Sequence, residues 1–186
     1  MNNRLFLGIQ VDAETELRLF EPRHAEEYFA LAERNREHLY EWTDIKAYEG
    51  SVETVREYIK QRLLSFANNQ GYHLGIWYQG KLIGNLSYGN LDWRSRKVEL
   101  GYWIDASMQG KGIITKVCQT MIQYAFEEHG LNKVEISCAA GNRRSRAVPE
   151  RLGFTQEGIH RQGDWQHDHF DDVVYYGLLA QEWKKG

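Results

Sequence analysis

The segment Met108-Gln109-Gly110-Lys111-Gly112-Ile113-Ile114-Thr115 places two glycines between an apolar strand pattern and an amphipathic helix pattern. The preceding residues 98–104 alternate between two faces, whereas residues 114–126 repeat apolar side chains every three or four positions. Glycine lets the backbone turn tightly and approach a ligand closely. A helix N-terminus adds unpaired N–H groups and partial positive charge. The segment therefore predicts a strand, a turn and a helix, with a turn that binds phosphate, most simply a diphosphate.

Length and charge limit the class of protein. The chain has 186 residues and a formal net charge of −3, with acidic and basic residues interspersed. A chain of this length can bury a full core as one unit, so we expect a single domain spanning residues 1–186. Interspersed charge argues against nucleic acid as a direct partner, because nucleic acid favours a basic face.

The cellular compartment follows from the cysteines and the apolar runs. The two cysteines, Cys118 and Cys138, fall in apolar periodic segments, as small buried hydrophobic residues do in a reducing compartment. No apolar run approaches the ~18–20 residues that span a membrane. Residues 1–4 lack the apolar core of a signal peptide. We therefore expect a cytoplasmic protein without membrane contact.

Periodicity in the rest of the chain predicts an α+β fold. Helices are expected over residues 25–39, 51–66, 114–126 and 141–152. Strands are expected over residues 5–11, 17–20, 72–78, 82–88, 97–104 and 133–140, from Gly153 onward, and over residues 172–179. Residues 160–171 are expected to form the loop between the last two strands. This order predicts a central mixed, mostly antiparallel, twisted sheet of about seven strands flanked by about four helices.

The glycine pair alone does not identify the phosphate ligand. A dinucleotide-binding site needs a third glycine, and a P-loop needs G-x-x-x-x-G-K-S/T, and neither pattern is present. The pattern that fits is Q-x-x-G-x-(G/A), filled by Gln109 and Gly112, with Ile114 in place of the last small residue. This pattern resembles the coenzyme A pyrophosphate loop of the GNAT N-acetyltransferases.

Further motifs support the resemblance. Residues 99–104, Glu-Leu-Gly-Tyr-Trp-Ile, are similar to the E-x-G-Y-W-I strand of the RimL-like branch. Residues 142–154 are similar to the family's N-x-x-S-x-x-V-x-x-x-L-G-F helix, and residues 175–183 resemble its closing strand. The motifs cover nearly the whole chain in the family's order. The sequence therefore resembles a RimL-like GNAT, a branch described as ribosomal-protein N-acetyltransferases, and this implies the GNAT fold.

The resemblance implies that acetyl-CoA is the co-substrate and that no metal is used. The pantetheine arm would pair with the strand backbone, and the pyrophosphate would bind the N–H groups of residues 110–115. The implied cofactor-binding residues are Tyr102, Trp103, Ile104, Gln109, Gly110, Lys111, Gly112, Ile113, Ile114, Thr115 and Asn142. Two of them have alternatives: Lys111 adds charge to the phosphates or is solvated, and Ile114 packs under the turn or shields its amides.

Amine acetylation sets the chemical demands on the catalytic residues. An ammonium must lose a proton, an oxyanion needs hydrogen-bond donors, and the thiolate leaving group needs a proton. The family often carries a catalytic glutamate on the strand over residues 97–104. We therefore expect Glu99 to be the general base, directly or through water, with Gly101 leaving space for substrate beside it. The alternative is a structural ion pair between Glu99 and Lys97.

A hydroxyl replaces the tyrosine that many family members use near the leaving group. Residues 141–152 contain no tyrosine, and Ser145 matches the serine used in the RimL-like branch. We expect Ser145 to donate a hydrogen bond or a proton to the thiolate; the alternative is helix capping with Asn142. His160, His167 and His169 match no standard zinc spacing, so we expect no metal site.

The motifs describe the cofactor and leave the acceptor open. The resemblance implies transfer to the N-terminal α-amine of a protein, with a ribosomal protein as a candidate. The alternatives are a small amine (a polyamine, an amino acid or an aminoglycoside) and a non-catalytic coenzyme A-binding interaction module. Residues 41–49 and the loop holding Trp165 and Phe170 are expected to wall the acceptor groove. The aromatic C-terminal region is a candidate surface for a homodimer or a higher homo-oligomer.

Overall fold

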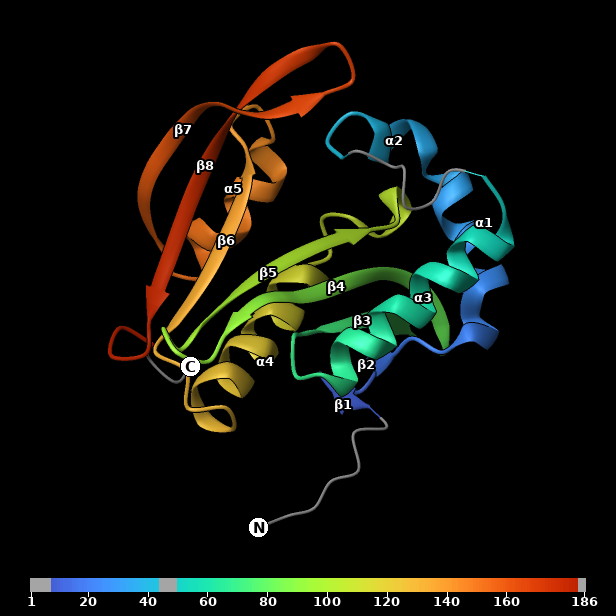
Figure 1. Cartoon of the computed structure of the whole chain (residues 1–186), viewed down its shortest axis with the longest axis horizontal. Coiled ribbons are helices and arrows are strands. Elements are labelled where there is room, and N and C mark those ends of the chain that lie inside the picture. Colours follow the sequence, from blue (N-terminus) through green and yellow to red (C-terminus); the bar gives the residue numbers. More distant parts are fainter. Residues whose placement is uncertain (1–7, 44–49, 184–186) are drawn as a thin grey trace.

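The chain folds around one eight-stranded sheet, seen in a computed structural model that describes residues 8–43 and 50–183 (Figure 1). The strand order is β1-β2-β3-β4-β5-β6-β8-β7, and every neighbouring pair is antiparallel except β5–β6. The strands are β1 (Ile9–Gln10), β2 (Thr15–Leu19), β3 (Tyr72–Tyr78), β4 (Lys81–Asp92), β5 (Lys97–Ile104), β6 (Lys133–Ala139), β7 (Thr155–Gln166) and β8 (His169–Leu179). The predicted mixed, mostly antiparallel α+β sheet is confirmed.

Helices cover the two faces of the sheet unevenly. They are α1 (Ala25–Arg34), α2 (Arg36–Tyr40), α3 (Val52–Ala67), α4 (Ile113–Glu127) and α5 (Arg143–Arg151). One face packs on α4 and α5, and its core contains Leu100, Val117 and Ile136. The other face packs on α1 and α3 over the first strands only, through Tyr28, Ile59 and Trp77. This second face of β6–β8 therefore carries none of the described helices (Figure 1).

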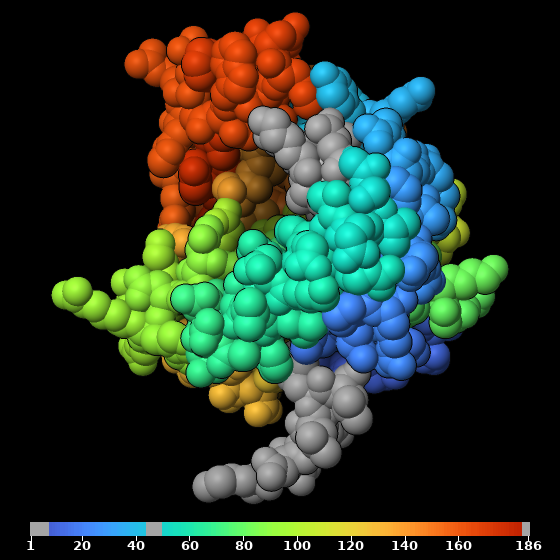
Figure 2. All heavy atoms as spheres, turned by 45° about the vertical axis from the view of Figure 1, so that its right-hand side comes forward, coloured from blue at the N-terminus to red at the C-terminus, as the bar shows by residue number. Residues whose placement is uncertain are grey.

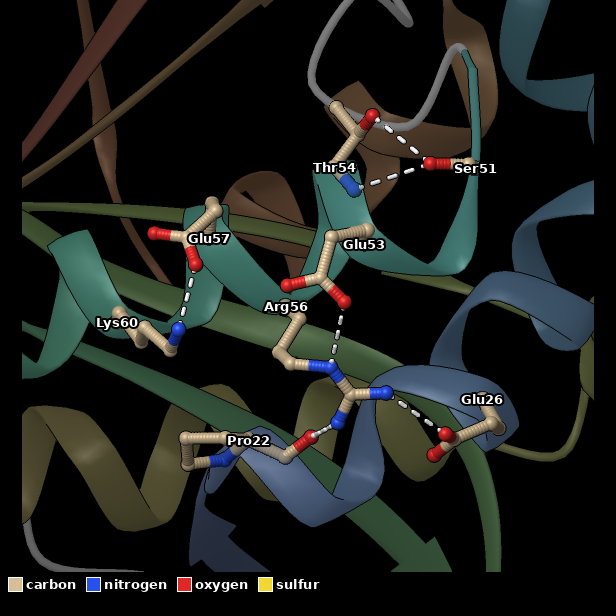
Figure 3. Close-up of polar contacts among 8 residues, drawn as sticks. All are labelled: Pro22, Glu26, Ser51, Glu53, Thr54, Arg56, Glu57 and Lys60. Carbon is tan, nitrogen blue, oxygen red and sulfur yellow. Dashed lines mark hydrogen bonds and ion pairs between the residues drawn. The ribbon is translucent and has the colours of Figure 1, made fainter.

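The entry into α3 illustrates how local sequence sets an element (Figure 3). Ser51 has an extended backbone and its hydroxyl accepts a hydrogen bond from the backbone N–H of Thr54, as an N-cap does. The guanidinium of Arg56 then joins α3 to the α1 region, because it donates to the Glu26 carboxylate at 2.7 Å and to the Pro22 carbonyl at 2.8 Å. These contacts hold α3 against α1 over one face of the sheet.

Two predicted elements differ from the structure. The predicted helix over residues 25–39 is split at Asn35, whose side chain is buried and bonded to the Leu31 carbonyl and to the Ala106 N–H instead of continuing one straight helix. The predicted loop over residues 160–171 is wrong: β7 and β8 form a long hairpin that turns at residues 167–168. The strand β7 is exposed along almost its whole length, so it lacks the alternation of apolar residues that identifies a half-buried strand.

Parts of two predictions lie outside the described residues. They are residues 5–7 of the first predicted strand and residues 44–49 of the segment expected to wall the acceptor groove. No helix within residues 8–43 and 50–183 is long and apolar enough to cross a membrane.

Candidate active site

The sheet opens where its one parallel pair separates. The strand β5 pairs with β4 along its length, but it pairs with β6 only from Lys97 to Glu99, with Glu99 opposite Glu135. Beyond that point β6 pairs only with β8, and Figure 1 shows β5 and β6 diverging. The β6-facing backbone edge of residues 100–104 is therefore left without a neighbouring strand.

Tyr102, Trp103 and Ile104, the residues predicted to face the pantetheine, line this gap with their backbone N–H and C=O groups. The side chain of Ile104 lies in the core, with 7% of the residue exposed. The indole of Trp103 packs on the opposite face, stacked on Tyr28 with ring centroids 6.0 Å apart. Because the side chains point into the two cores, an extended ligand in the gap could bond only to the strand's N–H and C=O groups.

The glycine turn leads directly into α4. Gly110 and Gly112 have φ values of 75° and 74°, in the left-handed region that favours glycine. Gly112 is the N-cap of α4, and the first bond closing the helix runs from the Lys116 N–H to the Gly112 carbonyl at 3.1 Å. The N–H groups of residues 113–115 therefore have no acceptor within the helix, and a glycine N-cap has no side chain to supply one. This arrangement is suited to binding an anion.

The segment that leads into the turn is tied to the α1–α2 junction. The buried Asp105 carboxylate accepts hydrogen bonds from the Ser107 N–H and from the Arg34 guanidinium at 2.8 Å. Burial raises the pKa of Asp105, but hydrogen bonds from Ser107 and the contact with Arg34 outweigh it, so the pKa is lowered overall. The side-chain oxygen of Asn35 accepts a hydrogen bond from the Ala106 N–H. These contacts fix the start of the turn relative to α1 and α2.

Two side chains of the turn, Ile114 and Lys111, were each given alternative roles from the sequence. Ile114 is half-buried and packs against the core, which supports packing under the turn over shielding of its amides. Lys111 is exposed. The amide of Gln109 joins two helices, because its nitrogen lies 2.6 Å from His38 Nε2 of α2 and its oxygen accepts from Arg144 of α5 at 2.8 Å. Arg151, also of α5, donates to the Thr115 hydroxyl at 2.9 Å, so α5 places two guanidinium groups next to the turn and the start of α4.

Glu99 occupies the last paired position before the gap. Its two carboxylate oxygens accept hydrogen bonds from the Asn90 amide of β4, at 2.6 Å, and from the Ser137 hydroxyl of β6. The alternative pair with Lys97 is wrong, because the Lys97 ammonium bonds the Glu135 carboxylate at 2.9 Å. The space expected beside Gly101 is partly filled, since a Cβ there would lie 2.6 Å from the Ser87 hydroxyl oxygen.

Ser145 lies on the other side of the gap, at the start of α5. Asn142 is the N-cap of this helix, and its side-chain oxygen Oδ1 accepts from the Ser145 N–H at 3.0 Å. Pro149 lacks the N–H that would bond the Ser145 carbonyl within the helix. The Tyr102 hydroxyl of β5 donates to that carbonyl instead, at 3.1 Å. Tyr102 therefore fixes the start of α5 relative to β5.

Both cysteine thiols have raised pKa values. Burial raises the pKa of the Cys138 thiol, and a hydrogen bond with the Ser145 side chain partly offsets that rise. Burial also raises the pKa of the Cys118 thiol on α4. Neither thiol is held as the thiolate that nucleophilic catalysis requires.

The open face of β6–β8 forms the wall of a groove next to Glu99. Strand alternation and register place Ser137, Tyr175, Asp171 and Asp164 on this face. Trp165 and Phe170 pair across the hairpin on the opposite face, so the prediction that they border the groove is wrong and the acidic residues border it. Figure 2 shows the surface hollowed between the orange-red hairpin and the green and cyan segments facing it.

The hairpin turn touches α2 across the groove. The imidazole of His167 stacks on the Tyr40 ring with centroids 3.5 Å apart, and its Nε2 lies 2.6 Å from the Tyr40 carbonyl oxygen. A pocket at this contact is lined by Tyr40, Glu41, His167, Asp168 and His169. Within the described residues, no group of three or more histidine, cysteine or acidic side chains is arranged to hold a metal ion.

Sequence reasoning missed Asn90 and Ser137. Asn90 falls in a polar stretch and gave no periodic signal. Ser137 was identifiable in principle, because alternation along β6 places it opposite the buried Val134 and Ile136.

Comparisons with known proteins agree with this geometry. The sequence profile described as "Acetyltransferase (GNAT) domain" matches residues 15–155. The "Putative ribosomal N-acetyltransferase YdaF" of Bacillus subtilis (strain 168) is 43% identical over 176 residues, covering 94% of this chain and 96% of that protein. The chain belongs to the GNAT acetyltransferase family. It is an N-acetyltransferase that uses acetyl-CoA.

Two solved structures show the same fold with bound cofactor. One is RimL, a ribosomal L7/L12 alpha-N-protein acetyltransferase in complex with coenzyme A, with a TM-score of 0.90, 26% identity, and coverage of 94% of this chain and 99% of that one. The other is the microcin C7 self immunity acetyltransferase MccE in complex with acetyl-CoA and AMP, with a TM-score of 0.88, 27% identity, and coverage of 93% and 96%. Relatives at this distance thus bind coenzyme A or acetyl-CoA and differ in their named functions.

Proposed function

We propose that this enzyme transfers the acetyl group directly to the N-terminal α-amine of a protein, with a ribosomal protein as the first candidate. The observation that carries the proposal is the gap between β5 and β6, which has Glu99 on its groove side and Ser145 on its helix side. A gap of this kind lets two substrates meet from opposite faces of the sheet. Direct transfer then needs no acyl-enzyme intermediate.

The cofactor would be held mainly by backbone groups. The pantetheine arm would lie along the free edge of Tyr102, Trp103 and Ile104, and the pyrophosphate would lie on the N–H groups of the turn. The residues proposed for the turn are those predicted from the sequence, namely Gln109, Gly110, Lys111, Gly112, Ile113, Ile114 and Thr115. Asn142 would act indirectly by capping α5, since its side-chain oxygen already accepts a hydrogen bond from the Ser145 N–H of that helix.

The two catalytic roles follow from the side of the gap on which each group lies. Glu99 would take the proton of the acceptor ammonium, directly or through water, so that the neutral amine attacks the thioester carbonyl. As the tetrahedral intermediate collapses, the sulfur leaves as a thiolate. The Ser145 hydroxyl would donate a hydrogen bond to that sulfur. The two roles require different faces of the sheet, and Glu99 and Ser145 lie on different faces.

The groove supports a cationic acceptor on an extended chain. Its wall carries Asp164 and Asp171 on the same face as Ser137 but further along the hairpin, and it is open along the uncovered face of β6–β8. The names of the related ribosomal acetyltransferases favour a protein N-terminus.

A small amine is the second candidate acceptor. The Tyr40–His167 contact narrows one end of the groove, and the similarity to MccE extends over nearly the whole chain. The paired donors on Glu99 argue against a third reading, a coenzyme A-binding module without activity, because such a module has no use for an oriented carboxylate in the gap.

The test is release of free thiol from acetyl-CoA across a panel of acceptors. The panel holds peptides with free α-amines, the same peptides with blocked N-termini and one internal lysine, and polyamines, amino acids and aminoglycosides. We expect turnover with free α-amines and none with blocked peptides. Turnover confined to small amines would replace the proposed acceptor, and tight acetyl-CoA binding without turnover on any amine would favour the module.

A further inference from the structure

We propose that Asn90 and Ser137 are positioning residues that hold the Glu99 carboxylate in its working orientation, one from each strand flanking β5. The inference rests on the proposed role of Glu99 in proton transfer. Each residue donates to a different carboxylate oxygen, the Asn90 amide to Oε2 and the Ser137 hydroxyl to Oε1. The side chain is thereby held from both sides at the point where the sheet opens.

Asn90 reaches Glu99 because β4 is irregular at that position. The β4–β5 register shifts between Gly89 and Asp92, and Asn90 adopts a φ of 48°. Left-handed backbone is uncommon for residues other than glycine, and asparagine tolerates it better than most. An extra residue in a strand re-aims the side chains beside it. Here the irregularity coincides with an amide bonded to the carboxylate at 2.6 Å.

Ser137 reaches Glu99 from the diverging strand. It lies two residues beyond Glu135, the last residue of β6 that pairs with β5. Its hydrogen bond is thus a side-chain link across the start of the gap, where backbone pairing has ended. The serine side chain is also small, so it fills less of the gap than a larger residue would.

The charges around Glu99 explain why neutral donors matter. The neighbouring Glu135 takes both nearby ammonium groups, from Lys97 and Lys133, each at 2.9 Å. Glu99 is therefore held by an amide and a hydroxyl, with no ion pair among its described contacts. An ionised carboxylate offers about four acceptor sites. Two bonds from neutral donors thus leave capacity to receive a proton from the acceptor ammonium.

The experiment compares two pairs of variants. Asn90→Gly keeps the left-handed backbone and removes the amide, and Ser137→Ala removes the hydroxyl. We expect each to lower kcat about tenfold, the usual order for losing one hydrogen bond to a charged group, with KM for acetyl-CoA unchanged. Ser137→Thr, which keeps the hydroxyl, should restore kcat.

Matched controls separate positioning from folding. Asn69→Gly replaces another left-handed asparagine, at φ 55°, and Ser87→Ala removes a hydroxyl that bonds the Gly101 carbonyl on the same pair of strands. Both controls should keep a kcat close to that of the wild type.

Combination with Glu99→Gln distinguishes the possible failures. If the inference holds, Asn90→Gly and Ser137→Ala add no further loss in the Glu99→Gln background, because they act through that carboxylate. Wild-type kcat in both single variants, with Glu99→Gln inactive, would overturn the positioning roles and leave the proposed mechanism standing. An unchanged rate in Glu99→Gln would overturn the base assignment and the positioning roles together.

Discussion

The two sides of the gap present different chemical groups, backbone groups on one side and side chains on the other. The proposed cofactor side is a continuous piece of chain, residues 102–115, which offers the free backbone edge of β5 and the N–H donors of a glycine turn and a helix start. The proposed acceptor side is assembled from side chains on separate strands, with Asn90 on β4, Glu99 on β5, Ser137 on β6 and Asp164 on β7. A backbone site tolerates changes in most of its side chains, whereas the acceptor side can change its chemistry by single substitutions.

Substitution of Glu99 should have the largest effect and fall on the acceptor side. Glu99→Gln keeps the shape and removes the proton acceptor, so kcat should fall about a hundredfold, the low end for general-base catalysis. KM for acetyl-CoA should stay within twofold of wild type, since the cofactor contacts are backbone groups. Steady-state kinetics with a peptide acceptor measure both. A rise in the acetyl-CoA KM with unchanged kcat would place Glu99 on the cofactor side.

Substitution of Gly112 should act on the cofactor side alone. Gly112→Ala forces a Cβ into left-handed backbone at the N-cap of α4, so the turn relaxes and the acetyl-CoA KM should rise about tenfold. Gly130→Ala is the control, because Gly130 has a φ of 60° and, as at Gly112, an added Cβ would meet no atom within 4 Å. It should cost similar stability, about 1 kcal/mol, without changing KM. Equal KM values in the two variants would contradict the proposed binding of the pyrophosphate by the glycine turn.

Substitution of Asp164 should change acceptor binding more weakly. Asp164→Asn removes one negative charge from the groove wall, so KM for a cationic peptide should rise about threefold at low salt, the order expected of a partly screened charge. Asp172→Asn is the control, since Asp172 alternates to the opposite face and accepts from the Gln162 N–H. A loss of kcat in Asp164→Asn larger than that in Glu99→Gln would move the proton acceptor from β5 to β7.

The link between Tyr102 and Ser145 should show the smallest effect, on stability. Tyr102→Phe leaves the Ser145 carbonyl without its donor and should cost about 1 kcal/mol. Pro149→Ala restores an N–H that can bond this carbonyl within the helix. Tyr102→Phe should therefore cost less in the Pro149→Ala background, which urea unfolding of the four proteins would reveal. Additive costs would mean that the hydroxyl does not replace the missing helix bond.

The same contrast explains what could be predicted from sequence. The alternation over residues 98–104, the glycine turn and α4 are encoded by neighbouring residues, so the sheet class and the strand, turn and helix of the proposed cofactor side were predictable. The β7–β8 hairpin was not, because β7 is an exposed edge strand whose polar residues resemble a loop. The donors on Glu99 were not, because Asn90 depends on a register shift and Ser137 on where β6 leaves β5, and neither is a local property.

The most direct test of the acceptor is a comparison of protein N-termini by mass spectrometry in cells with and without this protein. The account predicts that one or a few N-termini, with ribosomal proteins first among them, lose acetylation when the protein is absent. Acetylation should return with the wild-type chain and not with Glu99→Gln. Unchanged N-termini, together with loss of an acetylated small amine, would contradict a protein acceptor.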